Sequence, residues 1–265
     1  MVPAITGEKS AQNGACALVT GGSRGIGAAV VTALAARGWT VAFTARSIGD
    51  EAQALVDEVA QAGGRAEAYA VDSCDRDASD ALLATLTERH GGIAVVVANA
   101  GDEQIELLPS TTDDDWDRLV ELDLTAVFRL VRGVSIQMAR RRWGRIVLIS
   151  SAVTQVVPPG QVAYTAAKWG LEGLARTAAV ELGKRGVTAN CVAPGAIDTA
   201  MLRRHEHLAH PRAVAASIPA GRLGQPAEVA AAVAFLISDG GAYVNGSTLR
   251  VDGGLSVGAG AFNVA

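Results

Sequence analysis

The sequence is poor in aromatic residues and in charge. Phe, Trp and Tyr make up only 4% of its 265 residues, and only 19% are charged. Few aromatic residues argue against an aromatic-rich β-sandwich, whereas 49% hydrophobic residues suffice for a sizeable core and exclude intrinsic disorder. The formal charge of −4 lacks the basic excess of a nucleic-acid-binding protein. We therefore expect an α/β protein without a nucleic-acid partner.

Long apolar runs and paired cysteines are also missing. No uncharged stretch approaches the ~20 apolar residues that a membrane-spanning helix needs, so we expect no membrane partner. Residues 1–14 have no apolar segment of the kind found in signal peptides and are interpreted as a flexible tail. The three cysteines, Cys16, Cys74 and Cys191, are an odd number without a close pair and are interpreted as reduced thiols. These features predict a cytoplasmic protein.

Short apolar runs alternate with helix-length amphipathic stretches. The predicted strands cover residues 16–20, 40–44, 66–71, 93–98, 145–149, 187–192 and 248–251. The predicted helices cover residues 26–37, 51–62, 78–90, 113–142, 163–184 and 227–238. This alternation is typical of a parallel sheet with crossover helices, and no linker interrupts it. We predict one dinucleotide-binding catalytic domain over residues 15–265, a Rossmann-type doubly wound fold with a seven-stranded parallel sheet.

Two clusters have the composition of a metal site. Thr112 and the acidic residues 113–115 stand directly before a predicted helix, where they would cap free N–H groups and face the positive end of the helix dipole. His205, Glu206, His207 and His210 do not have the spacing of a His-Glu-x-x-His motif. We interpret the second cluster as a polar loop and predict no metal.

A glycine-rich turn follows the first predicted strand. It has the order Thr-Gly-x-x-x-Gly-x-Gly, and a helix follows it directly. Glycines permit a tight turn and the close approach of a pyrophosphate, whose charge is met by free N–H groups at the start of the helix. The candidate dinucleotide-binding residues here are Gly21, Ser23, Arg24, Gly25, Ile26 and Gly27.

The end of the second strand bears on the choice of dinucleotide. An acidic residue there would accept the ribose 2′-hydroxyl of NAD, but the chain has Ala45 and Arg46. Arg46 and Arg24 could instead hold a 2′-phosphate through charge-assisted hydrogen bonds, which favours NADP(H). The alternative is that both arginines are merely exposed.

The candidate catalytic residues follow the fifth strand. Tyr164 lies thirteen residues after Ser151, and Lys168 lies four residues after Tyr164, a spacing that places both side chains on one face of a helix. A neighbouring ammonium would lower the pKa of the tyrosine from about 10 toward neutral pH. An isolated pair of this kind is more often a half-buried tyrosine and a solvated lysine. The glycine turn upstream makes the catalytic interpretation the stronger one.

These motifs together resemble the short-chain dehydrogenase/reductase family, over nearly all of residues 15–254. The resemblance implies that Tyr164 protonates a carbonyl oxygen as hydride arrives from the nicotinamide, that Ser151 holds this oxygen, and that Lys168 binds ribose hydroxyls and tunes Tyr164. It also implies further contacts to the cofactor, by Asp72 and Ser73 after the third strand, by Asn99, Ala100 and Gly101 after the fourth, and by Pro194, Gly195, Ile197 and Thr199 after the sixth.

One position departs from the family pattern. Asp123 stands where the family has a catalytic Asn, which shapes its helix so that a main-chain carbonyl holds a water of the proton relay. An aspartate keeps an acceptor but loses the amide donor. A catalytically weak dinucleotide-binding protein is therefore the alternative from a different functional class.

Within the family, four segments look most like 3-oxoacyl-(acyl-carrier-protein) reductases: residues 160–161, 189–195, 218–226 and 245–254. This likeness implies NADPH-dependent reduction of a 3-oxoacyl thioester or a polyketide-type ketone to a hydroxyl, in fatty acid or polyketide biosynthesis. A reductase or dehydrogenase of a free small alcohol, sugar or steroid stays open as the alternative.

The same resemblance has implications for assembly and docking. Family members are commonly homotetramers that pair their long helices, here residues 113–142 and 163–184. The carrier-protein reductases dock their acidic partner with arginines at the positions of Arg142 and Arg185, and we expect both to lie near the mouth of the active site. The alternative is that these cations only complement the negative ends of their helices.

Overall fold

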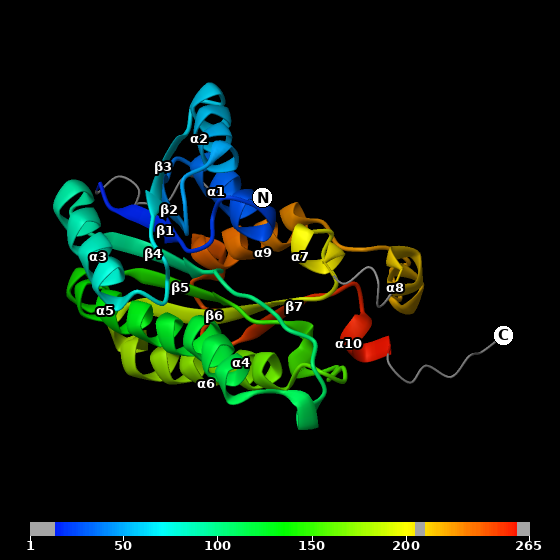
Figure 1. The fold of residues 1–265 in the computed structure, drawn as a ribbon. Coiled ribbons are helices and arrows are strands. Elements are labelled where there is room, and N and C mark those ends of the chain that lie inside the picture. The colour runs from blue at the N-terminus through cyan, green and yellow to red at the C-terminus, as the bar shows by residue number, and fades with distance from the viewer. Residues whose placement is uncertain (1–13, 205–209, 259–265) are drawn as a thin grey trace.

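The computed structural model describes residues 14–204 and 210–258, and within these ranges seven strands form one all-parallel sheet (Figure 1). The strands are β1 (Cys16–Val19), β2 (Thr40–Ala45), β3 (Arg65–Ala70), β4 (Ile93–Ala98), β5 (Gly144–Ile149), β6 (Val187–Pro194) and β7 (Thr248–Val251). Their order is β3-β2-β1-β4-β5-β6-β7, which confirms the predicted fold class. All but one residue of the predicted tail, 1–14, and also His205, Glu206 and His207, lie outside the described residues.

Helices cover both faces of this sheet (Figure 1). One layer contains α1 (Gly25–Ala35), α2 (Asp50–Gln61) and α9 (Pro226–Ile237), and the other contains α3 (Arg76–His90), α5 (Ala126–Arg141) and α6 (Val162–Leu182). Successive strand residues point to opposite faces, so in β1 Ala17 and Val19 join the first core cluster while Cys16 and Leu18 join the second. Burial on both faces explains why these strands are continuous apolar runs rather than alternating ones.

The strand order reverses between β1 and β4, and this point positions the site. In open α/β sheets, ligands bind beyond the carboxyl ends of the strands at such a reversal. Three short helices that the sequence did not predict, α7 (Ala200–Arg203), α8 (Pro211–Ser217) and α10 (Leu255–Gly258), gather on one side of the molecule (Figure 1). Since α7 follows β6 and α10 follows β7, these segments belong to the carboxyl edge of the sheet.

The predicted helix over residues 113–142 is not continuous. It consists of α4 (Asp113–Val120), a π-helical segment η3 (Glu121–Thr125) and α5. Thr112 caps α4 by accepting a hydrogen bond at 3.1 Å from the amide of Asp115, which confirms the capping interpretation. The π-helical segment carries Asp123, whose side chain is fully buried. Single π turns often occur at functional sites.

Residues 14–204 and 210–258 also bear on membrane spanning and metal binding. No helix there is both long enough and apolar enough to cross a membrane. Over the same part of the chain, His, Cys, Asp and Glu side chains do not gather in groups of three that could hold a metal ion.

Candidate active site

The glycine turn is fastened to the end of β4 by side chains. The hydroxyl of Thr20 accepts hydrogen bonds from the amides of Asn99 and Ala100, both at 3.0 Å. The Asn99 amide group donates in return to the carbonyls of Thr20 at 3.0 Å and Gly21 at 2.9 Å. The amide of Gly21 also donates to the hydroxyl of Thr44 at 3.3 Å. Thr20 and Thr44 were not predicted as site residues, although each stands at the end of a predicted strand.

The glycines of the turn form a cradle that side chains would fill. A Cβ atom at Gly27 would lie 2.1 Å from the carbonyl oxygen of Gly21, and one at Gly21 would lie 2.9 Å from the Cα of Ala100. Gly21 also has a φ of +63°, which favours glycine. Helix α1 begins without a side-chain cap, because Arg24 at the N-cap makes no such bond. A helix start that no side chain caps, reached through a tightly packed glycine turn, fits the pyrophosphate of a dinucleotide.

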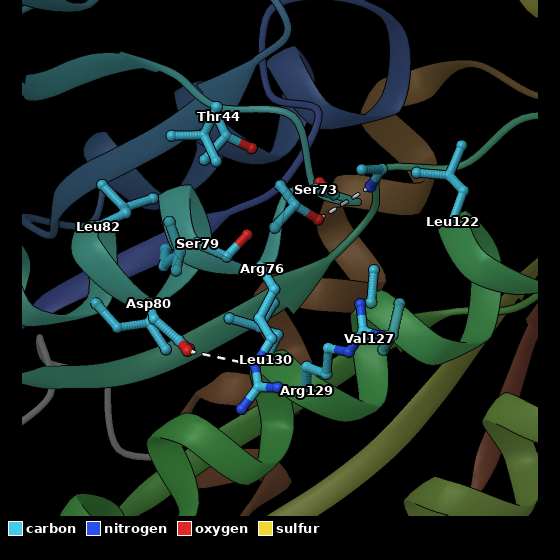
Figure 2. Close-up of a pocket in the computed structure, with 16 residues that line it drawn as sticks. Thr44, Ser73, Arg76, Ser79, Asp80, Leu82, Leu122, Val127, Arg129 and Leu130 are labelled. Atoms are coloured by element: carbon cyan, nitrogen blue, oxygen red, sulfur yellow. Dashed lines mark hydrogen bonds and ion pairs between the residues drawn. The ribbon is translucent and has the colours of Figure 1, made fainter.

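A pocket lies next to this cradle, between α3, α5 and the ends of β1 and β2 (Figure 2). Thr20, Thr44, Ser73 and Ala100 are among the residues that line it. Figure 2 shows Thr44 and Ser73 on one side of it, with Val127, Arg129 and Leu130 of α5 opposite. Two of the predicted cofactor residues, Ser73 and Ala100, therefore line a pocket beside the glycine turn.

The two arginines predicted to hold a 2′-phosphate share one edge of the sheet. The amide of Gly22 donates to the carbonyl of Thr44 at 2.9 Å, so the glycine turn lies against the end of β2. Arg24 and Arg46 follow these two contact residues closely, and both are exposed. Asp72, predicted near the adenine, is also exposed and accepts a hydrogen bond from the amide of Cys74 at 2.9 Å.

The segment after β6 lies beside the glycine turn. Gly195 follows Pro194, and its amide donates to the carbonyl of Val251 at 3.0 Å. Ile197 is buried, and Thr199 caps α7 by accepting a hydrogen bond from Leu202 at 3.4 Å. A Cβ atom built on Gly25 would touch the Thr199 methyl group at 3.4 Å. The structure thus brings the predicted nicotinamide segment next to the predicted pyrophosphate segment.

Ser151, Tyr164 and Lys168 meet at the carboxyl edge of the sheet. Ser151 follows β5, and the other two lie on α6. The ammonium of Lys168 is 5.3 Å from the centre of the Tyr164 ring, which confirms that the four-residue spacing places both on one face. Lys168 is buried and also donates to the carbonyl of Ile149 at 3.2 Å. The end of β5 therefore holds the lysine that stands beside the tyrosine.

Asp123 joins this group through an ion pair that the sequence did not predict. Its Oδ1 lies 2.7 Å from Nζ of Lys168, and its Oδ2 accepts a hydrogen bond from the amide of Asp102 at 3.2 Å. Both partners of the pair are buried, at 0% exposure for Asp123 and 4% for Lys168. A Cβ atom at Gly101 would lie 2.5 Å from Asp123 Oδ1, so this position needs glycine.

The pKa of Tyr164 does not shift as predicted. Burial raises it above 10, and this outweighs the ammonium of Lys168 and the hydrogen bond of Ser151, which lower it. The carboxylates of Asp123 and Glu103 raise it further. The predicted fall toward neutral pH is therefore wrong, because it counted the cation and neither the desolvation nor the anions. For Lys168, burial lowers the pKa but Asp123 and Tyr164 raise it, and the net direction is upward.

Two acidic residues directly after the Asn-Ala-Gly turn were missed. Asp102 forms ion pairs with Arg204 at 2.6 Å and with Arg118 at 3.3 Å, which ties the end of α7 to the loop after β4. Glu103 accepts a hydrogen bond from Gln161 at 3.3 Å, and burial raises its pKa. Their position directly after residues 99–101 was the feature of the sequence that could have identified them as site residues.

The expected position of Arg142 and Arg185 at the mouth of the active site is wrong for a single chain. Arg142 ends α5 just before β5, and Arg185 lies just before β6, whereas Ser151 comes after β5. A crossover helix runs antiparallel to its strands, so its end lies at the amino edge of the sheet. The length of β5 separates the two edges by roughly 20 Å, at ~3.3 Å per residue.

The chain is similar to known proteins over almost its whole length. A family model described as enoyl-(acyl carrier protein) reductase matches residues 21–256. The chain is 42% identical to the 3-oxoacyl-[acyl-carrier-protein] reductase FabG of Aggregatibacter actinomycetemcomitans, over 90% of this chain and 98% of that protein. It is also 42% identical to the protein of the same name from Escherichia coli strain K12, over 91% of this chain and 97% of that one.

A solved structure agrees with these relatives. It is a proposed gluconate dehydrogenase from Agrobacterium tumefaciens, with a TM-score of 0.87 and 32% identity over 92% of this chain and 97% of that one. The fold, the glycine turn and the Ser151, Tyr164 and Lys168 cluster accord with these matches. The chain belongs to the short-chain dehydrogenase/reductase family.

Proposed function

We propose that this chain uses NADPH to reduce the 3-oxo group of an acyl thioester, carried by an acyl carrier protein, to a hydroxyl. The observation that carries this proposal is the meeting of Ser151, Tyr164 and Lys168 beside the glycine cradle, at the edge where α/β sheets bind ligands. The names of the 42% identical relatives support the choice of substrate.

The residues divide the chemistry between them. The dinucleotide, when bound, supplies the hydride. The hydroxyl of Tyr164 donates a proton to the carbonyl oxygen that becomes the alcohol, and the hydroxyl of Ser151 holds that oxygen in place. Lys168 and the turns that contain Gly21, Asn99 and Gly195 orient the ribose and the two ends of the cofactor.

The function is tested by following NADPH absorbance with acetoacetyl and crotonyl thioesters. We expect NADPH to be consumed with the 3-oxo substrate and not with the 2-enoyl substrate, because Tyr164 and Ser151 serve a carbonyl oxygen. Consumption with the enoyl thioester alone would favour the activity that the family model's description names. No turnover with either, or with a panel of ketones, would favour a catalytically weak dinucleotide-binding protein.

A second candidate is the oxidation of a free sugar acid or another small alcohol. The 32% identical gluconate dehydrogenase structure favours it. In the same assay run in reverse, gluconate or simple alcohols with NADP⁺ would then be turned over faster than a 3-hydroxyacyl thioester.

We further propose a homotetramer that pairs α5 and α6. These helices expose large apolar side chains, namely Phe128, Ile136, Trp169 and Val180, of which Val180 is 82% exposed. Exposed apolar side chains of this kind on two neighbouring helices favour a contact between proteins. Light scattering should report four times the mass of one 27.0 kDa chain, and a mass of one chain would contradict the assembly.

Such pairing gives Arg142 and Arg185 a docking role that they lack within one chain. A twofold axis across α5 and α6 makes the paired helices antiparallel, so a second copy would carry its own Arg142 and Arg185 toward this active-site edge. Both arginines are exposed and would attract an acidic carrier protein.

This docking role predicts a difference between substrates. Changing both Arg142 and Arg185 to Glu should raise KM for a carrier-bound substrate by about tenfold at low salt, since it reverses two steering charges. KM for a small thioester should stay unchanged. The exposed Arg37, changed to Glu on the opposite face of the sheet, is the matched control. An equal effect on both substrates, or none, would show that the arginines have no docking role.

We place the enzyme in the cytoplasm. All three cysteines are unpaired, and Cys16 and Cys191 are buried within β1 and β6. Unpaired thiols fit a reducing compartment.

A further inference from the structure

Asp123 and the carbonyl of Ile149 together use most of the hydrogen-bonding capacity of Lys168. An ammonium has three donors. In Lys168, one contacts Asp123 at 2.7 Å and one reaches the carbonyl of Ile149 at 3.2 Å. The π-helical turn η3 and the amide of Asp102 hold the carboxylate in place from its other side. At least one donor of Lys168 is left for a ribose hydroxyl.

The pair changes the charge that Tyr164 experiences. An ammonium 5.3 Å from the ring centre would by itself stabilise the phenolate form. A carboxylate 2.7 Å from that ammonium makes the two groups together neutral. The carboxylate therefore offsets part of the effect of Lys168 on Tyr164, and the ammonium, whose effect is the larger of the two, still lowers the pKa of the tyrosine.

The other groups that act on Tyr164 do not replace this charge. Ser151 after β5 favours the phenolate by hydrogen bonding, whereas Glu103 after β4 opposes it. Lys168 is the one cation among the described groups that act most strongly on this tyrosine. Burial acts on Tyr164 more strongly than Lys168 does, and Asp123 adds to it, so the pKa of Tyr164 lies above its usual value.

We propose that Asp123 is a positioning residue that offsets part of the charge of Lys168 and thereby keeps Tyr164 in its proton-donating form up to a higher pH than Lys168 alone would allow. This inference rests on the proposed function in one respect, namely that Tyr164 is the proton donor. An asparagine at position 123 cannot cancel the charge, since its amide is neutral.

The pH dependence of the reaction follows from the protonation state of Tyr164. Reduction needs the protonated phenol, and its rate falls as pH rises through the pKa of Tyr164. Oxidation needs the phenolate, and its rate rises through the same pKa. A raised pKa therefore extends reduction into alkaline pH and moves the rise of the oxidation rate to higher pH, while the ratio of the two rates at any one pH stays fixed by the equilibrium of the reaction.

The small number of tyrosines makes the proposal directly measurable. The chain has three, Tyr69, Tyr164 and Tyr243. In protein labelled with ¹³C at the tyrosine Cζ, each ring gives its own titration by NMR, and single Tyr→Phe variants assign the signals. Tyr243 is fully exposed, and burial together with Glu67 raises the pKa of Tyr69 to about 12, so both serve as internal references.

The titration has a defined expected outcome in the protein without substrate. Tyr164 should titrate above 10 in the unaltered chain, and Asp123→Asn should lower its pKa by about one unit or more because an unpaired cation then faces the ring. In the double variant Asp123→Asn with Lys168→Met, which removes both charges, the pKa should rise again to the unaltered value or above it, because the effect of the lysine is the larger of the two. The alkaline limb of the pH profile for ketone reduction should move down by the same amount in Asp123→Asn.

A matched control is available on the same helix. Glu172 on α6 is buried and pairs with Arg176 at 3.4 Å, so Glu172→Gln removes a buried paired carboxylate without touching Lys168. It should leave the Tyr164 titration unchanged. An unaltered Tyr164 that titrates below about 9 overturns the proposal, and so does an Asp123→Asn titration that does not move. Failure of the carbonyl assay with a normal tyrosine titration would instead count against the proposed substrate alone.

Discussion

Tyr164→Phe is expected to lower kcat by about 10²–10⁴-fold while the Kd for NADPH stays within about twofold, because the change removes only the general acid. The ring of Tyr164 is half-buried, and Phe keeps this ring. Steady-state kinetics with an acetoacetyl thioester and fluorescence titration with NADPH measure the two quantities separately.

The control for this prediction is Tyr243→Phe. Tyr243 is fully exposed, so its loss should leave kcat and the melting temperature unchanged. Retention of more than about a tenth of kcat by Tyr164→Phe would remove Tyr164 from the role of proton donor, since general acid catalysis contributes ~10²-fold or more.

Arg46→Asp is expected to reverse the cofactor preference. The ratio of kcat/KM for NADPH to that for NADH should fall by at least about a hundredfold, because a charge-assisted bond to the 2′-phosphate is lost and a repulsive carboxylate replaces it. The same carboxylate can accept the ribose 2′-hydroxyl of NADH. Initial rates with the two cofactors at several concentrations give this ratio directly.

Arg65→Asp, at the exposed start of β3, introduces the same charge change away from the carboxyl edge and is the matched control. Its ratio should match that of the unaltered chain. Equal use of NADPH and NADH by the unaltered chain would show that Arg24 and Arg46 are merely exposed.

The fold was predictable because its signals are local. Alternation of apolar runs and helices revealed all seven strands to within about two residues at each end. The spacing of Tyr164 and Lys168 was equally readable, since residues four apart on a helix share a face. The short helices α7, α8 and α10 escaped prediction because segments of four to seven residues carry too little periodicity.

The electrostatics of the site were not predictable in the same way. A single π-helical turn at Asp123 leaves the hydrophobic pattern of its neighbours almost intact, so the sequence gives no sign of where the carboxylate points. Desolvation of Tyr164 depends on everything that packs around it, and it reversed the shift expected from Lys168 alone. The wrong position predicted for Arg142 has another cause. A crossover helix runs antiparallel to its strands, so the topology alone already places the end of α5 at the amino edge of the sheet.

The hydrogen bonds that join Thr20 and Asn99 affect the thermodynamics of cofactor binding. Four hydrogen bonds, all between 2.9 and 3.0 Å, hold the glycine turn without help from a ligand. A turn that is already rigid loses little conformational entropy on binding, so most of the interaction energy is available as affinity. The heat-capacity change of binding should then reflect the surface that the dinucleotide itself covers, with no contribution from coupled folding of the loop.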